Sequence, residues 1–325
     1  MNKLVTIHIL TFNSEQYIED CLNSALNQTY ENIEIIVTDN NSKDKTIERL
    51  KQFKDIRIIK NKRNTGYTGG HNKGIKQSRG EYIILLNPDV VLDKDFTKNI
   101  VRCMEEDKKI GAIQAKVYQL NKNKKTNTID TLGNRVFNTG RIIDIQQGEK
   151  DKNQKPKKLF AANGVCPAYR QKALNDIKLK THYLDQDFFC YVEDIDLSWR
   201  LRWRNWKIKY CPKATAWHDR TSAKSLGKGF KGFRKIRKTQ SLWMRKIGWR
   251  NQRLLFIKNM PISNIFSPTF FLREIKMFLY LLFFEPRVAF EIRNVLKLMP
   301  KMIKKRRIIM KNKKVKPREI KKLLK

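Results

Sequence analysis

Through its first 90 residues the chain alternates short apolar runs with segments in which apolar residues recur at helical spacing. Regular alternation of strands and helices is typical of parallel sheets, because two parallel strands must be joined by a long crossover, usually a helix. We therefore expect an α/β fold with a doubly wound, mostly parallel sheet. The expected strands are Leu4–Leu10, Ile33–Val37, Ile56–Ile59 and Tyr82–Leu86, and the expected helices are 17–26, 42–53 and 68–77.

The carboxyl ends of the expected strands are polar. They comprise residues 11–13, 39–42 and 87–89, and two of the three carry a carboxylate. Ligands of open α/β sheets bind at this edge. The turn after the first strand lacks the G-x-G-x-x-G pattern of dinucleotide-binding sheets, and no G-x-x-x-x-G-K-[ST] phosphate loop occurs anywhere in the chain. These absences argue against an oxidoreductase and against a P-loop nucleotidase.

The second part of the sheet region is less regular. Residues 121–158 are polar and rich in lysine, which indicates a variable loop or a hairpin excursion. A helix is expected from Glu193 through Trp203, followed by a strand at Trp206–Cys211. We expect one domain over residues 1–222, with a donor half at about 1–110 and an acceptor half at about 111–222, and a basic helical region at 223–325.

Positive charge is concentrated in that last region. The chain carries a net charge of +39, and residues 220–325 hold 31 basic and only four acidic residues. Such a block indicates a polyanionic partner: nucleic acid, an anionic membrane surface or a phosphorylated substrate. Apolar residues at 292, 295, 296 and 299 form a helical stripe, broken at Pro300, that favours a membrane over nucleic acid; a solvated helix is the remaining alternative.

Cysteine usage and hydropathy bear on the compartment. The five cysteines include no C-x-x-C pair, and Cys21 and Cys211 lie in apolar segments, so we expect buried reduced thiols and a cytosolic setting. The longest strongly apolar stretch, Met277–Phe284, is only eight residues long, so no membrane-spanning helix is expected. No signal peptide is expected before the first strand. We predict a cytoplasmic protein attached peripherally to the inner face of the cell membrane.

Several polar motifs occur in a fixed order along the first 200 residues. Together they resemble a family 2 glycosyltransferase of the GT-A fold, a Rossmann-like sheet flanked by helices, in its rhamnosyltransferase-like branch. The resemblance covers about residues 1–220 and extends weakly to Arg250–Phe256, which includes Asn251. The motifs are Thr11-Phe12-Asn13-Ser14, Thr38 to Asp44, Asn64 to Gly74, Leu86-Asn87-Pro88-Asp89 and Glu193 to Arg200.

This resemblance implies an enzyme of cell-surface polysaccharide biosynthesis. It would transfer one sugar, rhamnose or another hexose, from a nucleoside-diphosphate-sugar to a glycan or polyprenyl-diphosphate-linked acceptor, with inversion. Relatives that build polymers carry Gln-x-x-Arg-Trp, and the comparable stretch Trp199–Trp203 lacks the Gln, which favours addition of one sugar. The alternatives are a sugar-nucleotide-binding protein without catalysis and, less favoured, a nucleic-acid-binding protein.

The resemblance also implies a set of donor-binding residues. Asp39 would accept hydrogen bonds from the nucleobase or ribose, although an Asp at this place can equally cap the following helix. The glycine-rich segment from Asn64 would allow close approach of the donor, although a plain turn explains it as well. The full set is Thr11, Phe12, Asn13, Asp39, Asn41, Asn64, Gly66, Gly69, Gly70, Asn72 and Asn87.

A divalent cation, Mg²⁺ or Mn²⁺, is implied at Asn87-Pro88-Asp89. The usual family motif is Asp-x-Asp, and this chain keeps only the second carboxylate, Asp89. Carboxylate oxygens suit these hard ions. His218 completes the site in the branch that the chain resembles, so we expect it as a second ligand. A simple proline turn and a structural histidine are the alternatives.

The pair Glu193-Asp194 is the expected catalytic centre. Inverting transfer needs one base to take the proton of the acceptor hydroxyl. The family assigns this role to the second residue, Asp194. Trp199 and Arg200 are expected near the acceptor or the diphosphate. Asp196 and Arg200, however, are four residues apart and can instead form a salt bridge along the helix.

Overall fold

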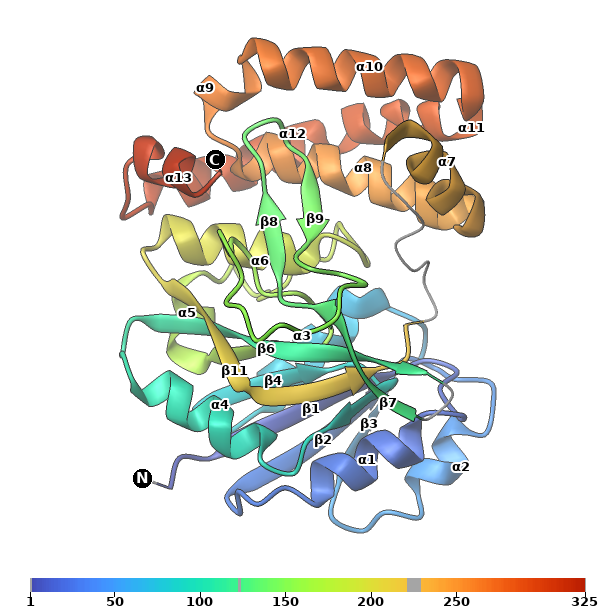
Figure 1. Cartoon of the computed structure of the whole chain (residues 1–325), viewed down its shortest axis with the longest axis vertical. Helices are drawn as coiled ribbons and strands as arrows, with labels where there is room; N and C mark the ends of the chain where they lie inside the picture. Colours follow the sequence, from blue (N-terminus) through green and yellow to red (C-terminus); the bar gives the residue numbers. More distant parts are fainter. Residues whose placement is uncertain (1, 122–123, 221–228, 325) are drawn as a thin grey trace.

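The computed structural model describes residues 2–121, 124–220 and 229–324. A mixed sheet with flanking helices forms one half of the molecule, and helices of the C-terminal region form a second layer beyond it (Figure 1). The α/β fold expected from the sequence is confirmed. The layer of C-terminal helices consists of α7 (Gly229–Thr239), α8 (Leu242–Asn259), α9 (Ile262–Ile265), α10 (Pro268–Phe284), α11 (Pro286–Ala289), α12 (Ile292–Lys311) and α13 (Pro317–Leu323).

The main sheet has the order β3-β2-β1-β4-β10-β6-β11-β5, with β7 paired to β6. Strands β3, β2, β1 and β4 run parallel, and β10 lies antiparallel between β4 and β6. Because β1 and β2 are in register from Val5–Ile33 to Thr11–Asp39, their polar carboxyl ends meet. The strands are β1 (Val5–Thr11), β2 (Ile33–Asp39), β3 (Arg57–Lys60), β4 (Tyr82–Leu86), β5 (Val90–Leu92), β6 (Ile110–Asn121), β7 (Lys124–Thr131), β10 (Ala168–Arg170) and β11 (Lys207–His218).

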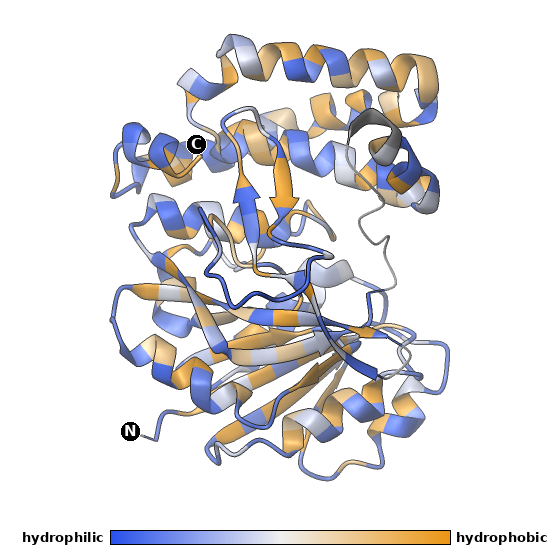
Figure 2. Cartoon of the chain, in the orientation of Figure 1, coloured by the Kyte–Doolittle hydropathy of each residue, from blue (hydrophilic) through white to orange (hydrophobic). Residues whose placement is uncertain are grey.

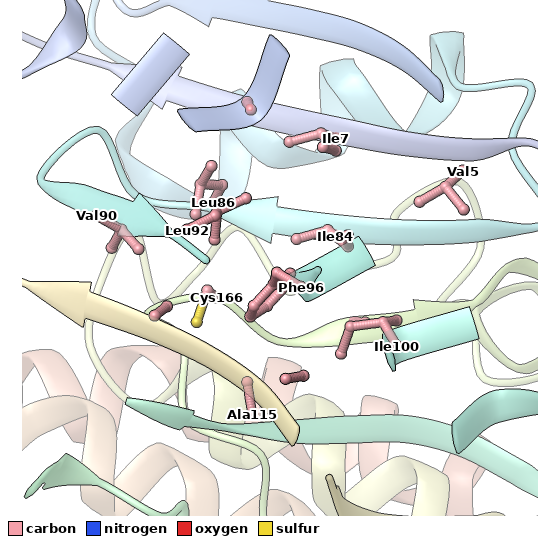
Figure 3. Packing of buried hydrophobic residues seen from close by; sticks show 14 of the residues in the cluster. Val5, Ile7, Ile84, Leu86, Val90, Leu92, Phe96, Ile100, Ala115 and Cys166 are labelled. Atoms are coloured by element: carbon pink, nitrogen blue, oxygen red, sulfur yellow. The ribbon is translucent and has the colours of Figure 1, made fainter. Parts of the chain in front are cut away.

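Apolar side chains from the central strands and from the neighbouring helices, chiefly α1 and α4, form the main core. Ile7 of β1 and Ile84 of β4 are completely buried and lie near Phe96 and Ile100 (Figure 3). β4 is buried along its whole length, as its unbroken apolar sequence predicts. The helices that accompany the sheet are α1 (Ile18–Leu26), α2 (Thr46–Leu50), α3 (Gly66–Gln77), α4 (Phe96–Glu105), α5 (Gln171–Asp176) and α6 (Glu193–Trp203).

The polar segment 121–158 forms the expected excursion. After β7, a hairpin of β8 (Asn134–Val136) and β9 (Ile142–Asp144) projects from the sheet toward the C-terminal helices (Figure 1). The hairpin is anchored by its own polar groups, because the Asn134 side chain donates to Asp144 over 2.9 Å. The lysine-rich sequence therefore contains ordered structure that hydropathy alone did not reveal.

Three expected boundaries need correction. The helix expected over 42–53 is reduced to α2, because Ser42 and Asp44 are used to bond the backbone of residues 13 and 15. The last strand extends past Cys211 to His218. α12 continues through Pro300 without a break, since residues on both sides of this exposed proline are held by packing on α8. Local sequence could not supply these tertiary constraints.

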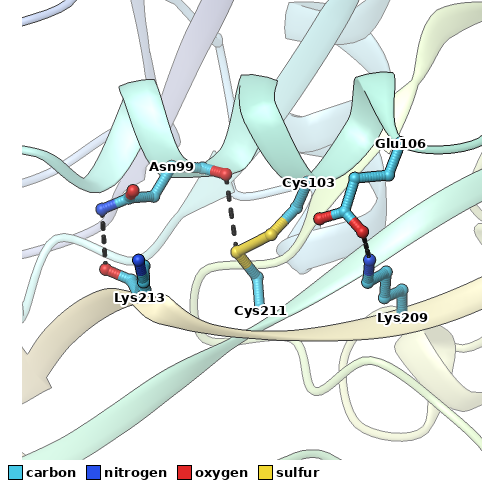
Figure 4. Close-up of a disulfide and its surroundings, with 6 residues drawn as sticks. All are labelled: Asn99, Cys103, Glu106, Lys209, Cys211 and Lys213. Atoms are coloured by element: carbon cyan, nitrogen blue, oxygen red, sulfur yellow. Dashed lines mark hydrogen bonds and ion pairs between the residues drawn. A yellow bond between two sulfur atoms is a disulfide. The ribbon is translucent and has the colours of Figure 1, made fainter.

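The expectation that all cysteines are reduced is wrong for one pair. Cys103 of α4 and Cys211 of β11 form a disulfide (Figure 4). The two residues are 108 positions apart, so their proximity follows from the packing of α4 against β11. Cys21 and Cys166 are buried free thiols, as expected. Cysteine usage therefore no longer indicates a reducing compartment.

The C-terminal helices share a hydrophobic cluster with the sheet domain. Trp199 and Trp203 of α6 pack in one core with residues from α8 to α13. The apolar stripe expected to face a membrane is divided: Val295 and, one turn beyond the proline, Met302 are buried in this cluster, whereas Leu296 and Ile303 remain exposed. The expected boundary near residue 222 falls outside the described residues. No helix in the described ranges is both long enough and apolar enough to span a bilayer.

Buried charges connect α6 to α8. Lys258 is completely buried, and its Nζ lies 2.6 Å from a carboxylate oxygen of Asp185 and 2.7 Å from one of Asp196. Asp196 also accepts from the guanidinium of Arg200 over 3.0 Å and from the side-chain amide of Asn259 over 2.8 Å. Each charge in this network has a partner, which is the condition for burying it.

We predict that Lys258→Met lowers the free energy of unfolding by about 3 kcal/mol, because Asp185 and Asp196 lose a buried counter-charge. The matched control is Lys301→Met, which removes an exposed ion pair with Asp187 and should cost less than about 1 kcal/mol. Urea unfolding of both variants measures the difference. Equal stability of the two variants would contradict the structural role of the network.

Candidate active site

A pocket of about 470 Å³ opens where β4, α6, β11 and the start of α8 meet. It brings together residues that are up to 131 positions apart in the chain and that were expected in separate roles. Asn87 and Asp89 follow β4, Glu193 and Asp194 begin α6, and His218 ends β11. The expected metal ligands and the expected base therefore line one pocket.

The loop that leads into Glu193 has an unusual backbone. Phe189, Tyr191 and Val192 all adopt positive φ angles, between 64° and 74°. Such angles are costly for non-glycine residues, above all for β-branched valine. The side-chain amide of Asn251 in α8 holds the loop by donating to the carbonyls of Phe188, Cys190 and Tyr191 at 2.7–3.0 Å. A C-terminal helix thus fixes the strained loop that presents the carboxylate pair.

Asp194 is held by backbone donors and remains partly exposed to the pocket. Its two carboxylate oxygens accept from the N–H groups of Ile195 and Gly164, each over 2.8 Å. The Gly164 carbonyl in turn accepts from the hydroxyl of Tyr67 over 2.8 Å. These bonds orient the carboxylate and leave lone pairs for a further partner.

The two neighbouring carboxyls differ in acidity. Burial raises the pKa of Asp194 to about 6, although the backbone bonds counteract this rise. Glu193 is more deeply buried and lies beside Asp194, and both effects raise its pKa well above the usual range. Glu193 is therefore the weaker acid of the pair, and Asp194 loses its proton at the lower pH.

Asp89 and His218 face each other across the same pocket. The Nε2 atom of His218 lies 3.3 Å from Oδ2 of Asp89, and its Nδ1 atom lies 2.8 Å from Oδ2 of Asp130. Burial alone would lower the pKa of His218, but its bonds to Asp130 and Asp89 raise it to about 9. The surrounding carboxylates thus favour a positive charge at this point of the pocket.

The chemistry of these side chains fits a divalent cation held together with a diphosphate. Oδ1 of Asp89 is buried and has no hydrogen-bond partner among the described residues. Asp130 holds one nitrogen of His218, as carboxylates do behind metal-ligating histidines. No three His, Cys, Asp or Glu side chains of the described ranges form a complete metal site. Mg²⁺ and Mn²⁺ need few protein ligands when phosphate oxygens and water supply the rest.

Asp39 has its hydrogen-bonding capacity used within the protein. One carboxylate oxygen accepts from the backbone N–H groups of Asn41 and Ser42, each over 3.0 Å. The other accepts from the hydroxyls of Ser42 and Thr11. These bonds form the 39–42 turn and join the ends of β1 and β2; Asp39 does not cap the following helix, which was its alternative role, because α2 begins only at Thr46.

The other expected donor residues lie in turns near this edge and in helix α3. Phe12 is exposed, and Asn13, which has a positive φ, bonds the 42–43 turn through its backbone and its side chain. Asn64 accepts from the Gly66 N–H over 2.8 Å. Asn72 is buried and bonds the backbone of Tyr183 and Leu184. Of the eleven residues, Asn87 alone lines the pocket.

The glycines of the 64–74 segment are explained by close packing. Gly66 has φ +70°, and a Cβ there would collide with the backbone of Phe189 in the strained loop. Cβ atoms at Gly69 and Gly70 would collide with Thr65 and with Leu10. The segment therefore supports the loop before Glu193 and the end of β1.

Trp199 and Arg200 lie in the core, away from the pocket. Arg200 donates to Asp196 and to the carbonyls of Ile177 and Tyr183, and it is 1% exposed. Trp199 is completely buried against Phe160. Neither side chain reaches an acceptor or a diphosphate in this arrangement. The salt bridge along the helix, which was the alternative for Arg200, is present.

Sequence reasoning missed several residues of the pocket. Asp130, from the lysine-rich excursion, bonds both His218 and Arg220. Arg220 also reaches Asp144 over 3.3 Å. Tyr67 lies in the motif from Asn64 to Gly74, which was interpreted only through its glycines, although its side chain lines the pocket. Arg220 could have been suspected from the sequence, because it lies two residues after His218. Asp130 could not, because its partners His218 and Arg220 are about 90 positions away.

Solved structures of similar shape support the fold. The chain is similar to S. aureus TarS 1-349 in complex with UDP, with a TM-score of 0.50 and 17% identity over 94% of this chain and 90% of that one. It is also similar to GalNAc-T7 with UDP, GalNAc and Mn²⁺, with a TM-score of 0.56 and 14% identity over 84% of this chain and 54% of that one. At these identities the likeness shows the GT-A-like fold alone.

Sequence relatives agree with the motifs. The chain is 28% identical over 216 residues to the poly-beta-1,6-N-acetyl-D-glucosamine synthase of Staphylococcus aureus strain COL and 27% identical to that of Staphylococcus epidermidis. The match covers 66% of this chain and 49% of each relative, so the chain spans about half their length. These relatives are not rhamnosyltransferases, so the expected branch is not supported. The family model "Glycosyl transferase family 2" matches residues 6–178, more than half of the chain, and the protein therefore belongs to this family of glycosyltransferases.

Proposed function

We propose that this enzyme transfers one hexose, with inversion, from a uridine-diphosphate-sugar to a glycan or lipid-linked acceptor. The observation that carries the proposal is the single pocket in which Asp194 lies with Asp89 and His218. A glycosyl transfer of this kind needs a base for the acceptor hydroxyl and positive charge beside the leaving diphosphate. The pocket offers groups suited to both tasks.

Asp194 is proposed as the base. It is ionised at neutral pH, its oxygens are oriented by Gly164 and Ile195, and it faces the pocket. An acceptor hydroxyl that approaches the sugar carbon would give its proton to this carboxylate while the bond to the diphosphate breaks. No acid is needed for the leaving group, because a nucleoside diphosphate leaves as an anion.

Asp89 and His218 are proposed to hold Mg²⁺ or Mn²⁺ together with the donor diphosphate. A bound divalent ion supplies positive charge that stabilises the departing phosphate oxygens. Asp130 would orient His218 for this role through the 2.8 Å bond to Nδ1. Asn87 lies at the same strand end and would contact the donor.

We also propose the identity of the donor sugar and the number of sugars added. Because the named sequence relatives are poly-N-acetylglucosamine synthases and TarS has been solved with UDP-GlcNAc, UDP-GlcNAc is the first donor to test and a rhamnose donor is the second. The absence of Gln-x-x-Arg-Trp still favours single addition over polymer synthesis. We further propose attachment to the inner face of the cell membrane, where polyprenyl-diphosphate acceptors would be reached.

We expect Asp194→Asn to lower kcat by about 10²–10⁴-fold, because it removes the proton acceptor and keeps the shape. Donor affinity, measured by calorimetry, should change little. Glu193→Gln is the matched comparison: it mimics the protonated acid and should retain far more activity. If Glu193→Gln is as inactive as Asp194→Asn, or if Asp194→Asn turns over within a few-fold of wild type, the assignment of the base is wrong.

The rate should also depend on pH through Asp194. Since its pKa is raised to about 6, kcat/KM should fall as the pH drops below 6, where the carboxyl becomes protonated, and should level off above. A pH series at saturating metal measures this limb. The residual activity of Asp194→Asn should not show this fall of kcat/KM below pH 6. If the variant still shows it, the ionisation belongs to another group.

Asp89→Ala should remove both activity and Mn²⁺ binding, because it removes the carboxylate proposed to bind the cation beside His218. Asp130→Asn should weaken Mn²⁺ binding by about 10–100-fold through His218. Calorimetry in the presence of UDP measures both effects, and Glu48→Gln, on the exposed side of α2, serves as the control. Full activity of the wild type in excess chelator would exclude the metal role.

A further inference from the structure

Helix α10 is apolar on two opposite faces, and only one of them is covered. Its inner face contributes Phe270 and Leu281 to the C-terminal core, where Phe270 packs edge-on against Phe256. The opposite face carries large apolar side chains that are 39–78% exposed in the described structure. They are Phe271, Leu272, Ile275, Leu279, Leu282 and Phe283.

This exposed face is continuous because its members recur at helical spacing. Residues 271, 275, 279 and 282 follow one another at intervals of four, four and three, and 272 and 283 flank them on the same side. In Figure 1 α10 is the outermost helix, at the end of the molecule opposite the sheet. Figure 2 shows mostly apolar colours along it. Apolar surface of this extent on a soluble domain marks a contact with a membrane or a protein.

The charge around α10 distinguishes between these partners. Lys276 on α10, Arg287 on α11 and Arg293 on α12 are exposed beside the apolar face or just past the end of the helix. Residues 220–325 together hold 31 basic and four acidic residues. A second copy of this chain would bring the same positive charge against this rim, which opposes self-association. An anionic lipid surface is complementary to both the rim and the apolar face.

We propose that α10 lies in the plane of an anionic bilayer, with Phe271, Leu279 and Phe283 among the acyl chains and the basic rim at the headgroups. The helix cannot span the bilayer, so it binds from one side. On α12 the apolar stripe is only partly available to a membrane, because Val295 and Met302 pack inward while Leu296 and Ile303 remain exposed.

The inference concerns binding and does not depend on the transfer reaction. Sedimentation of the full chain with phosphatidylcholine vesicles, with and without phosphatidylglycerol, tests it. We expect strong binding only to the mixed vesicles, weakened by salt. Phe271→Ser with Phe283→Ser should reduce binding by roughly tenfold for each side chain, since each buries a large apolar surface in lipid. Leu323→Ser, an exposed apolar residue of α13, is the matched control and should bind like wild type.

The charge contribution needs its own pair of variants. Arg287→Glu with Arg293→Glu should lower binding to mixed vesicles by at least about fivefold for each residue. Lys51→Glu with Lys54→Glu, which changes the net charge equally on the sheet domain, should have little effect. Thermal unfolding and UDP binding of all variants verify that they are folded.

Three results would overturn the proposal. One is vesicle binding that is unchanged by the double serine variant. Another is concentration-dependent dimerisation of wild type that the same variant abolishes, without vesicle binding, since this would assign the face to a second copy. The third is competition in which polynucleotide displaces the protein from mixed vesicles at equal salt, since nucleic acid would then be the preferred polyanion.

Discussion

The carboxylate of Asp196, buried between two helices, is the constraint on which the rest of the structure depends. It lies two residues after Asp194 and is bonded by Arg200 of its own helix and by Lys258 and Asn259 of α8. A buried charge without these partners would cost several kcal/mol, so α6 cannot adopt its position unless α8 is in place. The C-terminal region is therefore part of the structure that holds the carboxylates proposed to act in catalysis, and its basic composition does not make it an independent appendage.

The active site uses environment to separate the tasks of similar side chains. Three carboxyls line the pocket, and each is placed differently. Glu193 is deeply buried with its pKa raised well above the usual range, Asp194 is oriented by backbone donors, and Asp89 keeps an oxygen without a hydrogen-bond partner in the described chain. Differences in solvation and in hydrogen bonding thus give the three carboxyls different properties, which suit the separate roles proposed for Asp194 and Asp89.

Sequence reasoning succeeded where local pattern determines structure. The strand Tyr82–Leu86 and the helix Glu193–Trp203 have the expected bounds, because apolar runs and helical spacing report burial directly. It also identified five of the residues that line the pocket: Asn87, Asp89, Glu193, Asp194 and His218. It failed where distant partners decide: Cys103 pairs with a residue 108 positions away, and the role of Asp130 depends on His218, 88 positions away. Arg200 was expected near the acceptor or the diphosphate, because helical periodicity does not reveal which side of α6 is covered by α8.

The left-handed residues before Glu193 have a consequence for how the enzyme is made. The positive φ angles of Phe189, Tyr191 and Val192 are unfavourable for residues with a side chain. The hydrogen bonds from Asn251 stabilise the loop in this conformation. During synthesis the chain must be extended from residue 194 to residue 251, and α8 must dock, before that restraint exists. A nascent chain that has completed its sheet therefore still lacks an organised base. The carboxylate pair is therefore organised only after α8 has been synthesised and has docked on the sheet domain.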